Sequence, residues 1–196
     1  MKSNFLFRFS TMLMASALIL SAATINAQTL KIKSSTITIS GTTNVHPYTT
    51  TSTQASGELT VSNNQPTALS VTIPVKSIIN GERLMDKKTH ETFNEPKNPL
   101  ISFTMSEVKS ITTSDAGINV TVSGVLAMAG ASKTVTLEAK GKEVKPGTYT
   151  FEGSLPIKMS DYKMKAPTAM MGIMKVGDQV TVNYNVTFEG PAVRFD

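Results

Sequence analysis

Alternation of apolar and polar residues, repeated in run after run from Leu30 onward, is the feature that most constrains this fold. Side chains of a β-strand point alternately to its two faces, so a period of two with many β-branched residues is typical of half-buried strands. Clear examples are residues 36–40, 58–62, 69–73, 118–122, 135–138 and 180–186. Turn-forming residues separate these runs at 63–66, 115–117, 145–147 and 176–178. The pattern predicts about eight antiparallel strands with short connections, in a sandwich or an up-and-down barrel.

Residues 81–94 form the one segment after the N-terminal region that has helical character. The segment lacks a β-branched run, and it places Leu84, Met85 and Phe93 near one face. Asn80 is a candidate N-cap, and two prolines shortly after the segment prevent its continuation. The sequence therefore predicts one short helix inserted in an otherwise all-β domain.

The first 27 residues have the layout of a secretory signal peptide. Lys2 and Arg8 give a basic start, residues 13–20 an apolar core, and residues 25–27 a plausible cleavage site. No later run is long enough to cross a bilayer as a helix. We therefore expect a signal peptide at 1–27, a single β-barrel domain at 28–196, and a periplasmic or secreted location in a Gram-negative-type bacterium.

Charge and cysteine content exclude several classes of function. Loss of Lys2 and Arg8 lowers the formal net charge from +5 to +3, and the remaining lysines are scattered, so we expect no nucleic-acid partner. A transient contact with an anionic membrane surface remains open. The chain has no cysteine, which excludes disulfides, thiol catalysis and zinc–thiolate sites.

Metal and catalytic signatures are not present in the sequence. The two histidines, His46 and His90, lack the partners of a zinc motif, and no nucleophile elbow or phosphate-binding loop occurs. We expect no catalytic residue, no metal and no cofactor. Asn44, His46 and His90 are interpreted instead as polar residues at the rim of the barrel.

Methionine is concentrated in residues 155–175, which hold five of the eleven methionines in the chain. This side chain is flexible and polarisable, and it fills irregular gaps in cores as well as adaptable binding surfaces. Two interpretations therefore stay open: the cluster closes one end of the core, or it contacts an apolar ligand.

Four segments carry a resemblance to a known family. They are 43–48 (TNVHPY), the helix and following strand at 86–103, the hairpin region at 124–137, and residues 156–180. Together they resemble the YceI-like family of periplasmic, lipocalin-like proteins associated with polyisoprenoid binding. Many members have Arg-Asp-His-Leu where this chain has residues 85–88, and Trp where it has Tyr48, which is consistent with a subgroup.

The resemblance implies an eight-stranded antiparallel up-and-down barrel of the lipocalin-like type, with a lumen that holds a long apolar lipid. The absence of tryptophan and the small number of phenylalanines favour an open channel over a packed interior. The expected ligand is a polyisoprenoid, a quinone-like lipid or a fatty-acyl chain, carried or stored in the lumen. Strand parity and the helix face predict as its contacts Val45, Leu59, Leu84, Met85, Phe93, Ile101, Phe103, Met128, Met159, Met170 and Met171.

Two aspects stay open at this point. The helix either covers the barrel mouth as a lid through Met85 and Phe93, with Lys87 and Lys88 toward solvent, or merely closes the barrel end. The alternative function is a ligand-free structural or stress-related envelope protein with a packed barrel, and an enzyme on the same barrel ranks third. The oligomeric state is not predicted.

Overall fold

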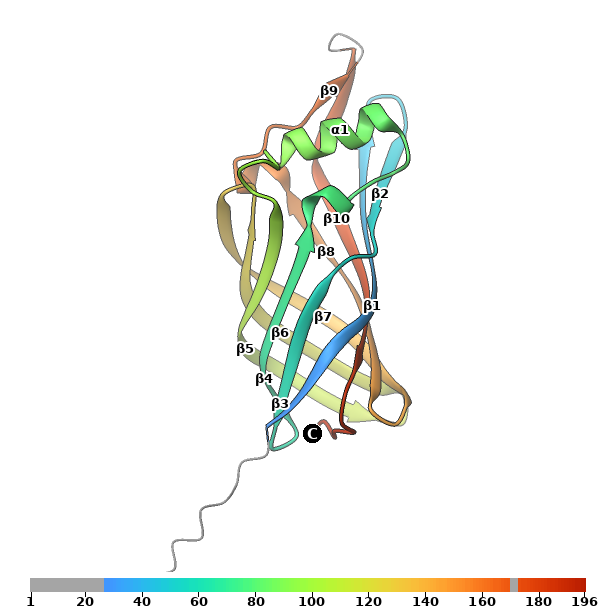
Figure 1. Cartoon of the computed structure of the whole chain (residues 1–196), viewed down its shortest axis with the longest axis vertical. Helices are drawn as coiled ribbons and strands as arrows, with labels where there is room; N and C mark the ends of the chain where they lie inside the picture. The colour runs from blue at the N-terminus through green and yellow to red at the C-terminus, as the bar shows by residue number, and fades with distance from the viewer. Residues whose placement is uncertain (1–26, 170–172) are drawn as a thin grey trace, which may run out of the picture.

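The computed structural model describes residues 27–169 and 173–196, so the predicted signal peptide lies almost entirely outside the described residues. An elongated β-barrel, with one α-helix lying across one end, makes up this part of the chain (Figure 1). The α-helix is α1 (Arg83–Thr92), and two short 3-10 helices are η1 (Val75–Ser77) and η2 (Met159–Tyr162). The strands are β1 (Gln28–Thr43), β2 (Pro47–Ser52), β3 (Ser56–Ser62), β4 (Gln65–Pro74), β5 (Leu100–Ser114), β6 (Gly117–Met128), β7 (Ala131–Lys145), β8 (Thr148–Lys158), β9 (Thr168–Ala169) and β10 (Met174–Glu189).

Eight strands form a closed antiparallel ring. Each strand from β3 to β7 pairs with the next, β8 pairs with β10, and β1 pairs with both β3 and β10. The short strand β2 continues the path of β3 along the other half of β1, and β9 forms a small hairpin with β10. The predicted eight-stranded up-and-down barrel is therefore confirmed.

The tightest hairpins follow from local turn chemistry. Asn63 and Asn64 connect β3 to β4 with φ angles of 51° and 64°, and Ala129 and Gly130 connect β6 to β7 with φ angles of 51° and 78°. Two consecutive residues with positive φ give a turn whose twist matches that of the flanking strands. These turns set the register of the strands on either side.

One predicted turn is wrong. Residues 176–178 lie inside β10, where Gly41 pairs with Val180 and Thr43 pairs with Val176. Between these two pairs β10 has two more residues than β1, and they form an irregularity in the ladder, so Gly177 lies in a bulged part of a continuous strand.

Helix α1 is shorter than predicted and begins after Glu82, which is its N-cap residue. Asn80 is not the N-cap: its side-chain oxygen accepts a hydrogen bond from the Glu82 N–H at 2.8 Å, and its own N–H donates to Asp86 at 2.7 Å. These two bonds fix the chain just before the helix, and the helix then crosses the barrel end (Figure 1). No helix among the described residues combines the length and apolar character needed to span a membrane.

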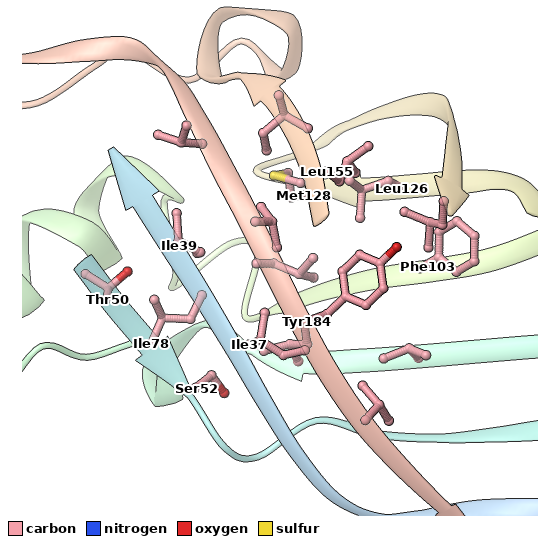
Figure 2. Close-up of a pocket in the computed structure, with 18 of the residues that line it drawn as sticks. Ile37, Ile39, Thr50, Ser52, Ile78, Phe103, Leu126, Met128, Leu155 and Tyr184 are labelled. Carbon is pink, nitrogen blue, oxygen red and sulfur yellow. The ribbon is translucent and has the colours of Figure 1, made fainter. Parts of the chain in front are cut away.

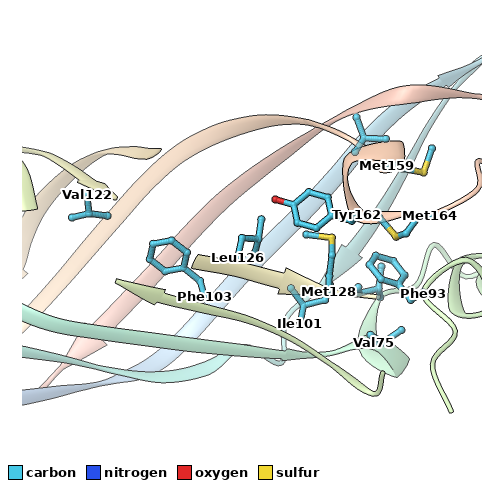
Figure 3. Packing of buried hydrophobic residues seen from close by; sticks show 12 residues of the cluster. Val75, Phe93, Ile101, Phe103, Val122, Leu126, Met128, Met159, Tyr162 and Met164 are labelled. Atoms are coloured by element: carbon cyan, nitrogen blue, oxygen red, sulfur yellow. The ribbon is translucent and has the colours of Figure 1, made fainter. Parts of the chain in front are cut away.

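Two apolar clusters fill the two ends of the barrel. The cluster at the α1 end contains Val75, Phe93, Met159 and Tyr162, and Figure 3 shows these side chains gathered beside Met128 and Met164. The second cluster lies toward the opposite end and includes Leu30, Leu59, Tyr149, Phe151, Val186, Phe188, Val193 and Phe195. Met159 and Met164 of the methionine-rich region are thus buried at this end of the core, and both also line the internal cavity, which is consistent with either predicted role.

Residues 191–196, called here the closing segment, cover the end of the barrel opposite α1, which we call the closed end (Figure 1). The Tyr149 hydroxyl donates to the Val193 carbonyl at 2.7 Å and accepts from the Val193 N–H at 2.9 Å. Thr113 donates to the Phe195 carbonyl at 2.9 Å, and Asp196 bonds to the β3–β4 turn. The segment is therefore attached to three separate parts of the barrel wall.

Candidate functional site

The barrel encloses a cavity of about 230 Å³ that runs along its inside from α1 to the closed end. Every strand of the ring of eight contributes lining side chains, and Figure 2 shows several of them, including Ile37, Leu126 and Tyr184. Toward the closed end the lining is Leu59, Ile111, Phe151, Val186, Phe188 and Phe195. Most of the wall therefore offers only apolar contact.

The cavity is long and narrow. On β10 its lining extends from Val176 to Phe188, and twelve residues at about 3.3 Å each, tilted about 40° to the axis, cover about 30 Å. A volume of about 230 Å³ lies below the ~300–1,000 Å³ usual for compact drug-sized ligands. Such a volume spread over such a length suits one slender chain.

Glycines make room for the aromatic rings that line this cavity. Gly141 pairs directly with Phe151, and Gly153 pairs directly with Tyr184. A Cβ atom at either glycine would overlap the facing ring, so the absence of a side chain lets each ring lie flat against the neighbouring strand. The rings thereby narrow the lumen without blocking it.

Tyr184 also provides a hydrogen bond to a backbone carbonyl that lies beyond the end of a strand ladder. The ladder between β7 and β8 ends at the pair of Ala139 and Gly153, which leaves the Glu138 carbonyl without a strand partner in β8. The Tyr184 hydroxyl donates to this carbonyl at 2.8 Å, and burial raises the pKa of Tyr184 to about 12. Tyr184 is therefore neutral, and its hydroxyl has a structural partner.

Polar groups line the cavity at the α1 end. The inward side chains of β2 are Tyr48, Thr50 and Ser52, all of which carry hydroxyls. Thr50 is only 3% exposed, and among the described residues no hydrogen bond of its hydroxyl is found. Ser52 bonds to Ser77 at 2.6 Å, and burial raises the pKa of Tyr48. Strand β2 thus presents hydroxyl groups to an otherwise apolar lumen.

Helix α1 completes this polar region. Its side chains that line the cavity are Met85, Lys88, Thr89 and Thr92, followed by Phe93, a spacing that places them on one face. Lys88 donates to Glu91 at 3.0 Å, and this hydrogen bond is the main reason that the pKa of Glu91 is lowered. Lys88 was predicted to face solvent; its side chain is 37% exposed, and it also lines the cavity. Lys88 lies three residues after Met85, on the same face of the helix, and this spacing could have predicted its position at the cavity.

Most of the predicted lipid contacts lie on the cavity wall. The structure places seven of them there: Leu59, Met85, Phe93, Ile101, Phe103, Met128 and Met159. Val45 and Leu84 lie outside the lining and are 63% and 62% exposed, because Val45 sits in the β1–β2 turn and Leu84 on the outer face of α1. Met170 and Met171 lie outside the described residues.

The three predicted rim residues make separate contacts. Asn44 joins the β1–β2 turn to the β9–β10 hairpin, since its amide donates to the Ile173 carbonyl at 2.9 Å and accepts from the Lys175 N–H at 2.8 Å. His46 bonds to the neighbouring Pro47 carbonyl at 2.8 Å. His90 bonds to the Ile78 carbonyl at 3.0 Å, which attaches α1 to the chain before it. None of the three lines the cavity.

Within residues 27–169 and 173–196, no group of three or more His, Asp or Glu side chains is placed to hold a metal ion. The polar side chains that line the cavity at the α1 end are those of Tyr48, Thr50, Ser52, Lys88, Thr89 and Thr92. They can orient a polar group of a ligand, and the apolar wall can bury a hydrocarbon chain.

Comparison with known proteins agrees with this geometry. The chain is similar to BcnA from Burkholderia cenocepacia (21% identity, 78% of this chain and 95% of that chain, TM-score 0.63). It is also similar to a polyisoprenoid binding domain from Saccharophagus degradans implicated in plant cell wall breakdown (14% identity, 85% and 99%, TM-score 0.64). A third similar structure is a YCEI protein from Campylobacter jejuni (25% identity, 63% and 72%, TM-score 0.52).

No curated protein matches the chain. The YceI-like domain, by contrast, matches residues 26–188, which include every strand of the barrel ring except the last residue of β10, Glu189. Its extent agrees with the closed eight-stranded ring and the single short helix described above. The chain belongs to the YceI-like domain family.

Proposed function

We propose that this chain binds one long apolar lipid inside the barrel, with the hydrocarbon chain along the axis and a polar group at the α1 end. The observation that carries the proposal is the continuous apolar lining from α1 to Phe195. Burial of each methylene group contributes about 0.8 kcal/mol, so a long chain gains affinity even where directional contacts are few. The narrow bore favours one chain over two.

The length of the cavity favours an isoprenoid over an ordinary acyl chain. About 30 Å equals the hydrocarbon thickness of a whole bilayer, whereas an acyl chain of a membrane lipid spans one leaflet. The related domain from Saccharophagus degradans is named as polyisoprenoid-binding, which supports the same class of ligand. A polyisoprenoid or a quinone-like lipid with a long side chain is the ligand class that we propose.

The distribution of polar groups supports the orientation. Thr50 is 3% exposed and lines the cavity, and Lys88 and Thr89 line the same end. The closed end offers the rings of Phe151, Phe188 and Phe195 instead. A polar head at the closed end would lose its hydrogen bonds with water and gain none in return.

Carriage or storage of the lipid, without chemical change, is the role we infer. The one cation on the lining is Lys88, which is paired with Glu91, and no facing acid and base are placed for catalysis among the described lining residues. The proposal includes export, supported by the signal-peptide pattern of residues 1–27, and transient contact with a membrane surface during loading. A ligand-free barrel with a structural role is the competing function.

The test is organic extraction of the purified protein followed by mass spectrometry, repeated after incubation with lipid vesicles that contain polyprenols. A stoichiometric long-chain lipid is expected. Leu137→Trp fills the lumen and is expected to abolish binding, while Thr136→Trp, on the outer face of the same strand, is the matched control. Clean extracts from the unmodified chain in both experiments would leave the packed structural barrel as the better account.

Orientation has a separate test. Thr50→Val keeps the shape of the side chain and removes its hydroxyl. Binding of a polyprenol should weaken several-fold, whereas binding of the hydrocarbon without the terminal hydroxyl should stay unchanged. An equal effect on both ligands would argue that the head lies elsewhere.

A further inference from the structure

We infer that Phe195 forms the floor of the cavity and sets the longest hydrocarbon chain that the barrel accepts; this rests on the proposed lipid-binding function. Within the closing segment, Phe195 is the residue that lines the cavity, and it is 4% exposed. Val193 and Tyr149 are also buried but do not line the cavity. They therefore form a packed layer behind the Phe195 ring.

The Phe195 ring is held on two sides by other aromatic rings. Its centroid lies 5.4 Å from that of Tyr149 and 6.1 Å from that of Phe151, and both pairs are edge-to-face, with interplanar angles of 83° and 84°. Both distances fall in the favourable range for such pairs. Since Tyr149 and Phe151 belong to β8, the ring is fixed against the barrel wall.

The backbone around Phe195 is fixed as well. Thr113 of β5 donates to its carbonyl at 2.9 Å, and the next residue, Asp196, donates its N–H to the Asn64 carbonyl at 3.2 Å. Side chains of Asn64 and Gln65 also bond to Asp196. A lipid chain that reached the ring would thus have to break several hydrogen bonds to displace it.

This floor lies outside the part of the chain that matches the family. The YceI-like match ends at residue 188, and the closing segment begins at residue 191. The length of the lipid site is therefore set by residues beyond the matched domain, so it is a property to be measured on this chain. Chain-length preference is the specificity that such a floor controls.

A fixed floor predicts a break in the dependence of affinity on chain length. Each added methylene should raise affinity by about fourfold while it finds apolar wall, and by nothing once the chain meets the ring. Phe195→Ala moves the floor back toward the Tyr149 ring, whose centroid is 5.4 Å away. The break should then shift to chains longer by a few carbon atoms.

The experiment measures the affinity of a graded series of straight-chain alcohols, from short to very long, by competition with a fluorescent lipid. The unmodified chain, Phe195→Ala, Phe195→Leu and Phe195→Trp are compared. Arg194→Ala is the matched control, since its side chain is exposed in the same segment. Thermal unfolding of each variant confirms that the barrel is folded.

The expected result is a break at longer chains in the alanine and leucine variants, at shorter chains in the tryptophan variant, and at an unchanged length in Arg194→Ala. A break that stays in place, or a uniform loss of affinity at all lengths, overturns the role of Phe195 as the floor. Failure of the unmodified chain to bind both the alcohols of the series and a polyprenol refutes lipid binding itself. The leucine and tryptophan variants decide the matter if the alanine variant does not fold.

Discussion

Replacing Tyr149 with phenylalanine removes a single oxygen atom from the layer that closes the barrel, and its effect on stability can be worked out from the structure. Tyr149 is 1% exposed, and its hydroxyl both donates to and accepts from the backbone of Val193. Without it, one buried N–H and one buried carbonyl lose their partner. Each such group costs about 1–3 kcal/mol, so the two together give an expected loss of about 2–6 kcal/mol in the free energy of unfolding.

Detachment of the closing segment sets an upper limit to this loss. Releasing the segment exposes Val193 and Phe195, and burial of each side chain contributes about 1.5–3 kcal/mol. Detachment of the closing segment therefore lowers the free energy of unfolding by about as much as two unpaired backbone groups do. The expected loss is the same whether the segment stays in place or detaches.

A double-mutant cycle in urea denaturation is the assay. In a chain that lacks residues 191–196, Tyr149→Phe removes no hydrogen bond to Val193, so its cost should fall below about 1 kcal/mol. Tyr162→Phe is the matched control: Tyr162 is 2% exposed, and no hydrogen bond of its hydroxyl is found in the described part of the chain. Equal losses from Tyr149→Phe in the full and shortened chains would refute the reasoning.

Three further outcomes follow from contacts at other places. Gly141→Ala forces a Cβ atom against the Phe151 ring, and urea denaturation should show a loss of about 1–3 kcal/mol; a neutral effect would mean that the ring has free space. Asp178 accepts hydrogen bonds from the hydroxyl and the N–H of Ser160, and these bonds lower the pKa of Asp178. The free energy of unfolding that they contribute is therefore present above the unfolded-state pKa and is lost as the pH falls below about 4. Asp178→Asn should flatten that part of the curve of unfolding free energy against pH, and an unchanged slope would contradict the assignment. Asn44→Ala removes two hydrogen bonds to the β9–β10 hairpin, so amide hydrogen exchange there should speed up while the rest of the barrel stays protected; unchanged exchange would show that the hairpin is held by other contacts.

The sequence pattern predicted the barrel well because, along each strand, apolar residues that face the interior alternate with polar residues that face solvent. It could not reveal the polar end of the cavity, since β2 has hydroxyl side chains on both faces and no alternation to interpret. In residues 191–196 the alternation of Val193, Arg194, Phe195 and Asp196 is too short to predict a position, which depends on Tyr149, far away in sequence. Residues 176–178 were predicted to form a turn because a glycine followed by an aspartate is common both in hairpin turns and in bulges, and the sequence does not distinguish the two.

The pairing of β1 with β10 has a consequence for how the protein folds. These strands contain the first and last strand residues of the described barrel, with Lys31 opposite Glu189. Closing a loop of about 150 residues costs about 2 kcal/mol more entropy than closing one of about ten, so this ladder is expected to form after the sequential hairpins. Until then both strands expose unpaired backbone edges, which are the surfaces most prone to aggregation. The enclosed cavity exists only after that last step, so a ligand bound there stabilises the native state alone.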